Sequence, residues 1–244
     1  MMRALCSVVI LAVACGLLPA GIRAETAAPA EGVALAIVYD TSGSMKATVG
    51  DSSGKSEPKE VIGKRALGAV LRRLQQFAAR EESPGVRRRI EFGLFTFDGN
   101  RIRPLVPFGV FEAKQAGTWP QRIPAASGGT PLGLALETAG RAVLRSPLLH
   151  KHVLVITDGE NTVGSAPEVL LRLLQNEAAA QQTALAVHFV AFDVDAKVFA
   201  PVKQLGATVV GAIDETELNT QLGLILEKKI LLEEEEPATT PQTH

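Results

Sequence analysis

The sequence has few of the residues that support thiol, imidazole or nucleotide chemistry. Its 244 residues include only two cysteines, Cys6 and Cys15, and four histidines. Both cysteines precede Ala24, so cleavage after that residue would leave a chain without disulfides or zinc thiolate sites. A formal net charge of −1 offers no basic surface for nucleic acid, and the sequence contains no Gly-x-x-x-x-Gly-Lys phosphate loop.

The two ends of the chain are expected to stand outside the folded domain. Residues 1–24 have a positive start, an apolar stretch too short to span a membrane comfortably and a small-residue exit. These features predict a signal peptide and export to the periplasm or beyond, with a lipid anchor at Cys15 as the less favoured alternative. Residues 25–32 are interpreted as a linker, 33–232 as one domain, and 233–244 as an acidic, Pro- and Thr-rich disordered tail.

Apolar strand-like segments alternate with amphipathic helix-like segments along this domain. The expected strands are 33–39, 90–97, 101–106, 153–157, 184–192 and 207–210, and the expected helices are 60–80, 131–144, 168–182, 197–205 and 215–232. A hairpin-type turn at 98–100 predicts that the third strand runs antiparallel at the sheet edge. The pattern therefore predicts an α/β fold, with a doubly wound, mostly parallel sheet and helices on both faces.

Oxygen-bearing side chains follow three of these predicted elements. Asp40, Ser42 and Ser44 form an Asp-x-Ser-x-Ser loop after the first strand, and Asp158 ends the strand that begins at residue 153. Thr130 follows a Gly-Gly pair where a helix is expected to start, although it could equally cap that helix. Ligands bind at this edge of open α/β sheets, and hydroxyl and carboxylate oxygens suit a hard divalent cation.

In these three loops the chain resembles the von Willebrand factor A domain family, and the loops resemble its metal-ion-dependent adhesion site. The resemblance covers nearly the whole expected mature chain and implies a Rossmann-like fold. It implies that the hydroxyls of Ser42, Ser44 and Thr130 ligate the metal directly, while Asp40 and Asp158 act directly or through water. Mg²⁺ is the expected cation, with Mn²⁺ or Ca²⁺ as alternatives.

The function that this site favours is protein binding rather than catalysis. Two acids and three neutral hydroxyls would leave the cation with positive charge and an open position, which an Asp or Glu carboxylate of a partner protein could complete. Two alternatives are a scaffold or regulatory subunit of a larger envelope complex and, less favoured, a metal-assisted hydrolase. The hydrolase lacks a recognisable general base, and Ser42 does not lie in a Gly-x-Ser-x-Gly nucleophile motif, because Asp40 stands where the first glycine should be.

Several other polar residues have a structural and a functional interpretation. Asp193 and Asp195 could form a second metal site, but helix capping is favoured, with Asp195 as the cap. His150 and His152 are expected to flank a strand start, and His188 is expected to be a satisfied core residue.

The polar segment 46–59 is expected to be a mobile loop beside the metal site, because it has almost no apolar residue with which to anchor itself. Lys46 and Lys55 could attract an acidic residue of a partner, and a passive surface loop is an equally favoured interpretation.

Overall fold

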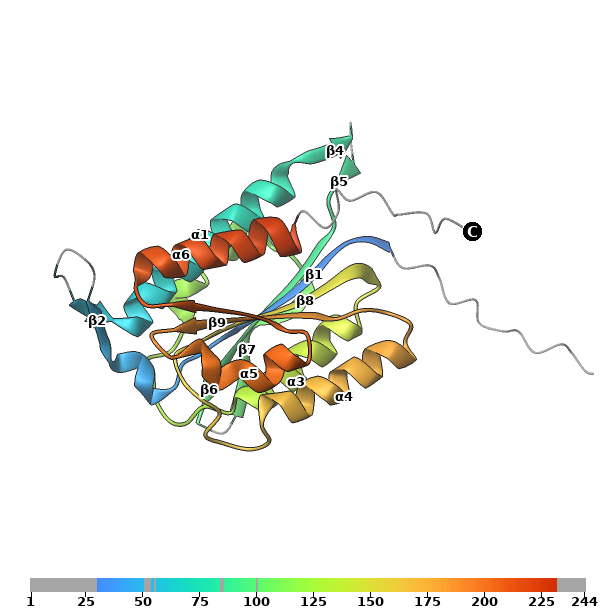
Figure 1. Ribbon diagram of the computed structural model, residues 1–244. Coiled ribbons are helices and arrows are strands. Elements are labelled where there is room, and N and C mark those ends of the chain that lie inside the picture. Colours follow the sequence, from blue (N-terminus) through green and yellow to red (C-terminus); the bar gives the residue numbers. More distant parts are fainter. Residues whose placement is uncertain (1–29, 51–53, 55, 84–85, 100, 232–244) are drawn as a thin grey trace, which may run out of the picture.

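The computed structural model describes residues 30–50, 54, 56–83, 86–99 and 101–231, and Figure 1 shows them as one sheet between two layers of helices. The expected signal peptide and acidic tail lie outside the described residues. The first strand begins at Ala30, within the segment expected to be a linker. Among the described residues, no helix has the length and apolar character needed to cross a membrane.

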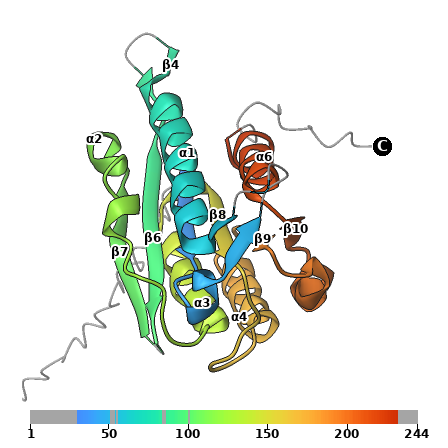
Figure 2. The same ribbon diagram turned by 90° about the vertical axis from the view of Figure 1, so that its left-hand side faces the viewer.

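The central sheet has six strands in the order β10-β9-β8-β1-β6-β7. They are β1 (Ala30–Tyr39), β6 (Ile90–Asp98), β7 (Arg101–Val110), β8 (Leu148–Thr157), β9 (Ala186–Phe192) and β10 (Thr208–Ala212). All neighbours pair in parallel except β7, which runs antiparallel to β6. Figure 2 shows β7 and β10 at opposite edges of this sheet. The predicted doubly wound sheet with an antiparallel edge strand is confirmed.

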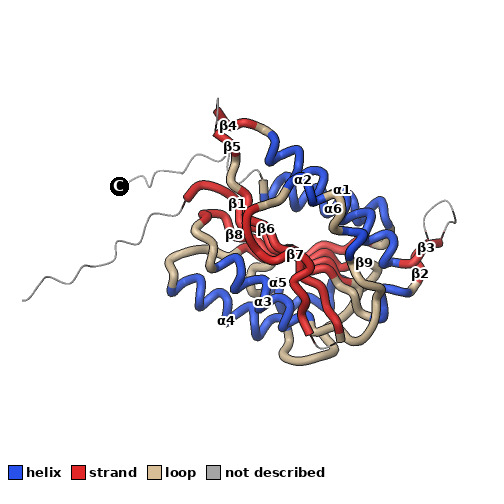
Figure 3. The backbone as a smooth tube through the Cα atoms, turned by 180° about the vertical axis from the view of Figure 1, so that it is seen from behind, coloured by secondary structure: helices blue, strands red, loops and turns tan. Residues whose placement is uncertain are grey.

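The helices form a layer on each face of the sheet, as Figure 3 shows from behind. They are α1 (Lys59–Ala79), α2 (Ala113–Ala116), α3 (Leu132–Leu144), α4 (Pro167–Ala180), α5 (Ala200–Gln204) and α6 (Glu215–Ile225), which continues into a π-helical turn, η4 (Leu226–Ile230). The described part of the chain also contains the short 3-10 helices η1 (Gly43–Lys46), η2 (Pro120–Arg122) and η3 (Ala196–Phe199). Helices α1 and α6 cover one face, and α3 and α4 cover the other (Figure 1).

Strand β1 is apolar and buried from Val33 to Tyr39, because both of its faces are covered there. Its larger side chains, including Leu35 and Ile37, pack in the core cluster under α1 and α6. The small residues Ala34 and Ala36 pack in the other cluster, against α3. The polar residues of the loop after β1 therefore start at the point where this buried strand ends.

The segment after the Asp-x-Ser-x-Ser loop is more ordered than expected. It contains η1 and an antiparallel hairpin of β2 (Thr48–Gly50) and β3 (Ser56–Pro58), and a second two-stranded ribbon, β4 (Glu81–Ser83) with β5 (Val86–Arg87), follows α1. Met45 and Val49 are buried in the core cluster beneath α1, so they anchor a segment that looked polar in the sequence. The expectation of a mobile loop over residues 46–59 is therefore wrong for 46–50 and 56–59, and Lys59 is the first residue of α1. Residues 51–53 lie outside the described residues. Lys55 lies outside the described residues.

Two glycines of α1 give a prediction about the packing of this helix. A Cβ at Gly63 would lie 2.4 Å from the Tyr39 hydroxyl, whereas at Gly68 the nearest atom would be 3.5 Å away. We expect Gly63→Ala to lower the free energy of unfolding by about 1–3 kcal/mol through overpacking. Gly68→Ala should raise it by about 0.5–1 kcal/mol, since it removes backbone freedom from the unfolded chain. Urea unfolding of both variants tests this, and equal effects would contradict it.

Candidate metal centre

Two carboxylates stand at the carboxyl-terminal edge of the sheet. Asp40 follows β1 directly and Asp158 follows β8, so the parallel pairing of these strands brings both acids to one edge. Asp40 is fully buried, and only 5% of Asp158 is exposed. The Asp40 amide donates to the carbonyl of Ile156 at 2.9 Å, which extends the ladder to the start of the loop.

Hydrogen bonds hold the buried Asp40 carboxylate in one orientation. Its Oδ1 accepts from the amide of Ser42 at 2.7 Å, and its Oδ2 accepts from the hydroxyl of Thr157 at 2.6 Å. Burial raises the pKa of the Asp40 carboxyl, and the hydrogen bonds from Ser42 and Thr157 partly offset that effect. Asp40 therefore organises the turn that presents the two serines.

A chain of hydroxyls links the first loop to Asp158. The hydroxyl oxygens of Ser42 and Ser44 are 3.0 Å apart, and Ser44 donates to Asp158 Oδ1 at 2.7 Å. A Cβ built on Gly159 would lie 3.7 Å from the Ser44 hydroxyl and 4.0 Å from that of Thr130. The structure thus brings the five predicted oxygen-bearing side chains to one edge of the sheet, around Gly159.

Thr130 does not cap the helix that follows it. Helix α3 begins at Leu132 with Pro131 in the capping position, and that cap makes no side-chain hydrogen bond. The backbone of Thr130 is held instead by Thr162, whose hydroxyl accepts from the Thr130 amide at 2.8 Å. The hydroxyl of Thr130 is therefore positioned without being used for capping.

Backbone hydrogen bonds join the three loops into one unit. The amide of Gly43 donates to Gly128, that of Ser127 to Thr41, and that of Thr162 to Thr130, at 3.0, 2.8 and 3.0 Å. A Cβ on Gly128 would lie 2.9 Å from the Cα of Gly99, and Gly128 has a φ of +75°. Glycine is needed at position 128 because the chain passes close to the β6–β7 turn in a left-handed conformation.

Lys59 is a functional-site residue that the sequence analysis missed. Its Nζ lies 3.1 Å from Asp158 Oδ2 and 2.9 Å from Asp193 Oδ2, and its side chain is 7% exposed. Burial alone lowers the pKa of Lys59, but the hydrogen bonds to both carboxylates outweigh this and raise it above the ordinary value. Lys59 therefore stays charged beside the proposed metal ligand Asp158.

The two acids after β9 have different roles. Asp195 caps η3 as predicted, with its carboxylate accepting from the amide of Lys197 at 2.9 Å. Asp193 is not a cap, because its side chain turns to Lys59 from a backbone with a φ of +51°. No local pattern in the sequence distinguishes the two acids, since the partner of Asp193 comes from a distant helix.

The chemistry of the donor set fits a hard cation. Among the described residues, no three His, Cys, Asp or Glu side chains gather in a metal-holding arrangement. A cation at this edge would therefore depend on the hydroxyls of Ser42, Ser44 and Thr130 as well as on the two acids. Oxygen donors of this kind are the ligands that Mg²⁺ and Mn²⁺ prefer.

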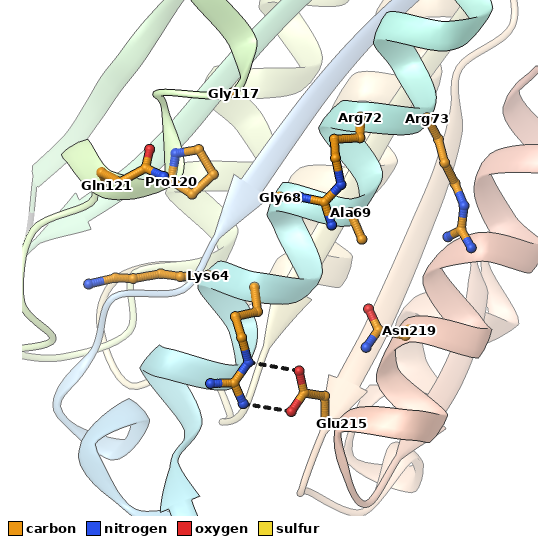
Figure 4. Close-up of a pocket in the computed structure, with 11 residues that line it drawn as sticks. Lys64, Gly68, Ala69, Arg72, Arg73, Gly117, Pro120, Gln121, Glu215 and Asn219 are labelled. Atoms are coloured by element: carbon orange, nitrogen blue, oxygen red, sulfur yellow. Dashed lines mark hydrogen bonds and ion pairs between the residues drawn. The ribbon is translucent and has the colours of Figure 1, made fainter.

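A groove with a volume of about 680 Å³ lies away from this centre, between α1, η2 and α6. It is lined on the α1 side by Lys64, Arg65, Arg72 and Arg73. Figure 4 shows Lys64, Arg72 and Arg73 in this groove. Arg65 donates to Glu215 of α6 at 2.9 Å, so part of this positive charge is paired. A lining with this excess of cationic groups does not suit a metal ion.

Solved structures that are similar to this chain share its fold at low sequence identity. A mutant of the PilB minor pilin from Streptococcus sanguinis has a TM-score of 0.62 and 14% identity over 85% of this chain and 64% of the pilin. Proximal thread matrix protein 1 from the mussel byssus, with zinc in its metal-ion-dependent adhesion site, has a TM-score of 0.60 and 15% identity over 82% of this chain and 48% of that protein.

A third structure is the von Willebrand factor domain of Mfa5, a type V pilus tip protein from Porphyromonas gingivalis. It has a TM-score of 0.51 and 14% identity over 81% of this chain and 94% of that domain. This chain spans less than two thirds of the mussel and streptococcal proteins, so these likenesses show the fold and not a shared whole-protein activity.

No curated protein sequence matches the chain significantly. A family model of the von Willebrand factor type A domain matches residues 34–222, which runs from β1 into α6 and includes all three oxygen-bearing loops. The chain therefore belongs to the von Willebrand factor type A domain family.

Proposed function

We propose that this chain is an exported, divalent-cation-dependent protein-binding module that captures an Asp or Glu carboxylate of its partner. The observation that carries the proposal is the hydrogen-bonded series from Ser42 through Ser44 to Asp158. The hydroxyl of Thr130 lies at the same edge and does not cap helix α3. These oxygens lie at the edge of the sheet where ligands bind in open α/β folds.

The donor set leaves a bound cation with charge to share. Ser42, Ser44 and Thr130 would contribute neutral oxygens, and Asp40 and Asp158 would contribute negative charge directly or through water. Lys59 offsets part of the charge of Asp158, because the two groups form a buried ion pair. The bound metal would supply an electrophilic position at the rim, where a partner carboxylate completes the coordination; Mg²⁺ is the proposed ion, with Mn²⁺ as a substitute.

The similar structures support binding in preference to catalysis. Two of them are pilus proteins, and the mussel protein holds zinc in the corresponding kind of site. Lys59, the basic group beside the centre, is held charged by two carboxylates and is therefore unsuited to act as a general base. Export is consistent with the pilus relatives and with the signal-peptide pattern of the first 24 residues.

Calorimetric titration with Mn²⁺ and Mg²⁺ tests the metal centre. Thr130→Val replaces the hydroxyl by a methyl group of similar size, and we expect it to weaken cation binding by about tenfold or more. Thr138→Val is the matched control, because the Thr138 hydroxyl only donates to Leu134 within α3. Equal cation affinity of the Thr130 variant and the wild type would refute the assignment of Thr130 as a ligand.

The open coordination position needs a separate test. Two peptides are added separately to the Mn²⁺-loaded protein, and the water-proton relaxation is measured. The peptides are identical except that one carries Asp and the other Asn at a single position. The Asp peptide should lower the relaxation enhancement by displacing metal-bound water, and the Asn peptide should not. If Mn²⁺ binds but neither peptide changes the signal, the cation is structural and the scaffold interpretation is favoured.

A further inference from the structure

The ion pair of Lys59 with two acids has a consequence for cation binding. Resting on the proposed function, we propose that the ammonium group of Lys59 competes with the metal ion for the Asp158 carboxylate. Asp193 weakens this competition, because its own ion pair with Lys59 draws the ammonium group away from Asp158. Lys59 is thus a positioning and affinity-setting residue, which itself needs no contact with the cation or the partner.

Both oxygens of Asp158 are engaged in this structure. Oδ1 accepts from the hydroxyl of Ser44 at 2.7 Å, and Oδ2 accepts from Lys59 Nζ at 3.1 Å. The side chains of Lys59 and Asp158 are 7% and 0% exposed, so little water screens their attraction. A cation that approaches Asp158 therefore meets a carboxylate whose charge is already partly offset by the ammonium group of Lys59.

The position of Lys59 is not explained by the stability of its own helix. Lys59 is the first residue of α1, where the helix dipole disfavours a positive side chain. Its amide donates to the carbonyl of Ala47 at 2.9 Å, which ties the start of α1 to the loop that carries Ser42 and Ser44. The interactions that favour the ammonium group here are those with Asp158 and Asp193.

Asp193 reaches Lys59 at a conformational cost. Its φ of +51° lies in the left-handed region, which a residue other than glycine adopts rarely. The amide of Asp193 donates to the carbonyl of Ala212 at 2.7 Å, so the backbone is fixed by β10. The carboxylate is 42% exposed, which places it at the rim and makes it the more accessible of the two partners of Lys59.

Opposite changes in affinity would distinguish this arrangement from a purely structural ion pair. Loss of the charge of Lys59 leaves Asp158 uncompensated and strengthens its attraction for a cation. Loss of the charge of Asp193 leaves Asp158 as the remaining ion-pair partner of Lys59, which weakens the attraction of Asp158 for a cation. A merely structural pair would instead reduce cation affinity in both variants, since both would disturb the loop.

The test is titration of the full chain with Mn²⁺ and Mg²⁺ by calorimetry. We expect Lys59→Gln to bind Mn²⁺ about tenfold more tightly and Asp193→Asn to bind it several-fold more weakly, because a unit charge a few ångströms away is only partly screened. Lys64→Gln and Asp195→Asn are the charge-matched controls. Lys64 is a more exposed lysine of α1 that pairs with Glu60, and Asp195 is 64% exposed.

Circular dichroism and thermal melts with and without Mn²⁺ separate folding from affinity. Mn²⁺ should stabilise the Lys59 variant more than the wild type, since the cation replaces the lost positive charge. If the wild type binds Mn²⁺ and the two variants shift in the same direction or not at all, this inference is overturned while the proposed function stands. If neither the wild type nor the Lys59 variant binds a cation, both fail, whereas binding by the Lys59 variant alone supports the inference.

Discussion

Replacement of Asp40 by asparagine is expected to abolish measurable Mg²⁺ and Mn²⁺ binding while the protein remains folded. Asp40 is the fully buried acid beneath the loop, and its carboxylate orients Ser42 through the Ser42 amide. Asparagine keeps the size of the side chain and one acceptor for that amide, but it removes one of the two negative charges from the donor set. A site that otherwise contains neutral hydroxyls and a lysine-paired acid then has little charge with which to hold a divalent cation.

The alanine variant of Asp40 answers a different question. It leaves the Ser42 amide without its acceptor, at a cost of about 1–3 kcal/mol, whereas the Thr157 hydroxyl can still donate to the carbonyl of Gly159 at 3.1 Å. Removing a buried carboxylate also relieves desolvation and repulsion from Asp158, the causes that raise the pKa of Asp40. We therefore expect alanine to abolish cation binding with a modest change in stability, measured by calorimetry and by urea unfolding.

Unchanged Mn²⁺ affinity in the asparagine variant would contradict the assignment of Asp40 to the metal centre. Asp214→Asn is a suitable control, because Asp214 caps α6 through a bond of its side chain to the Glu217 amide at 2.8 Å. Asparagine is also a good capping residue, so this variant should keep both its stability and its cation affinity.

Acid is expected to destabilise the fold through a pair of buried histidines. His152 of β8 and His188 of β9 lie side by side, with Nδ1 of His152 and Nε2 of His188 3.3 Å apart and their rings stacked at 5.6 Å. Burial, and then the charges of His188 and His150, lower the pKa of His152 to about 3. Burial, and then the charge of Lys229, lower the pKa of His188 to about 4.

The sign of the pH dependence follows from these lowered pKa values. The unfolded chain takes up protons on its histidines as the pH falls through their ordinary pKa of about 6.5, whereas the folded chain does not. Stability contributed by the neutral pair is therefore complete above that value and is lost as the pH falls from about 6.5 toward 4. Each pKa unit corresponds to about 1.4 kcal/mol, so the expected loss amounts to several kcal/mol.

Urea midpoints measured at about pH 7.5 and about pH 4.5 check this prediction. The variant His188→Leu should be less sensitive to acid than the wild type, because it removes one of the two groups that resist protonation. His150→Gln, in β8 but outside the stacked pair, should keep most of the sensitivity, because it removes only the smallest of the three causes that lower the pKa of His152. Equal acid sensitivity of the wild type and the Leu variant would show that other groups cause the loss.

The observed start of β8 also corrects the sequence-based expectation for two of these histidines. His150 and His152 were expected to flank a strand start, but β8 begins at Leu148 and includes both. The first half of this strand could not be predicted from hydrophobicity, because residues 150–152 are polar and an apolar run starts only at Val153. Pairing with β1, which joins Val33 to His150, forms the ladder there irrespective of side-chain polarity. His188 is buried as expected, and its partner is His152.

The sequence by itself determined the class of the fold and the five oxygen donors. Both depend on short-range patterns: apolar runs for strands covered on both faces, helical spacing for the flanking helices, and a turn motif with fixed residue types. Because parallel strands end at one edge, the position of each donor at a strand end or helix start was sufficient to predict that Asp40 and Asp158 would meet. That these residues bind a metal stays a prediction.

Only the tertiary structure decided what surrounds those donors. Lys59 contacts Asp158 from 99 residues away in the chain, and no local pattern marks a lysine as buried or names its partner. The same holds for Asp193, which differs from Asp195 only in the direction its side chain takes from a left-handed backbone. Charge pairing in a buried site depends on the distances that packing creates, and these distances are set by the whole fold and not by neighbouring residues.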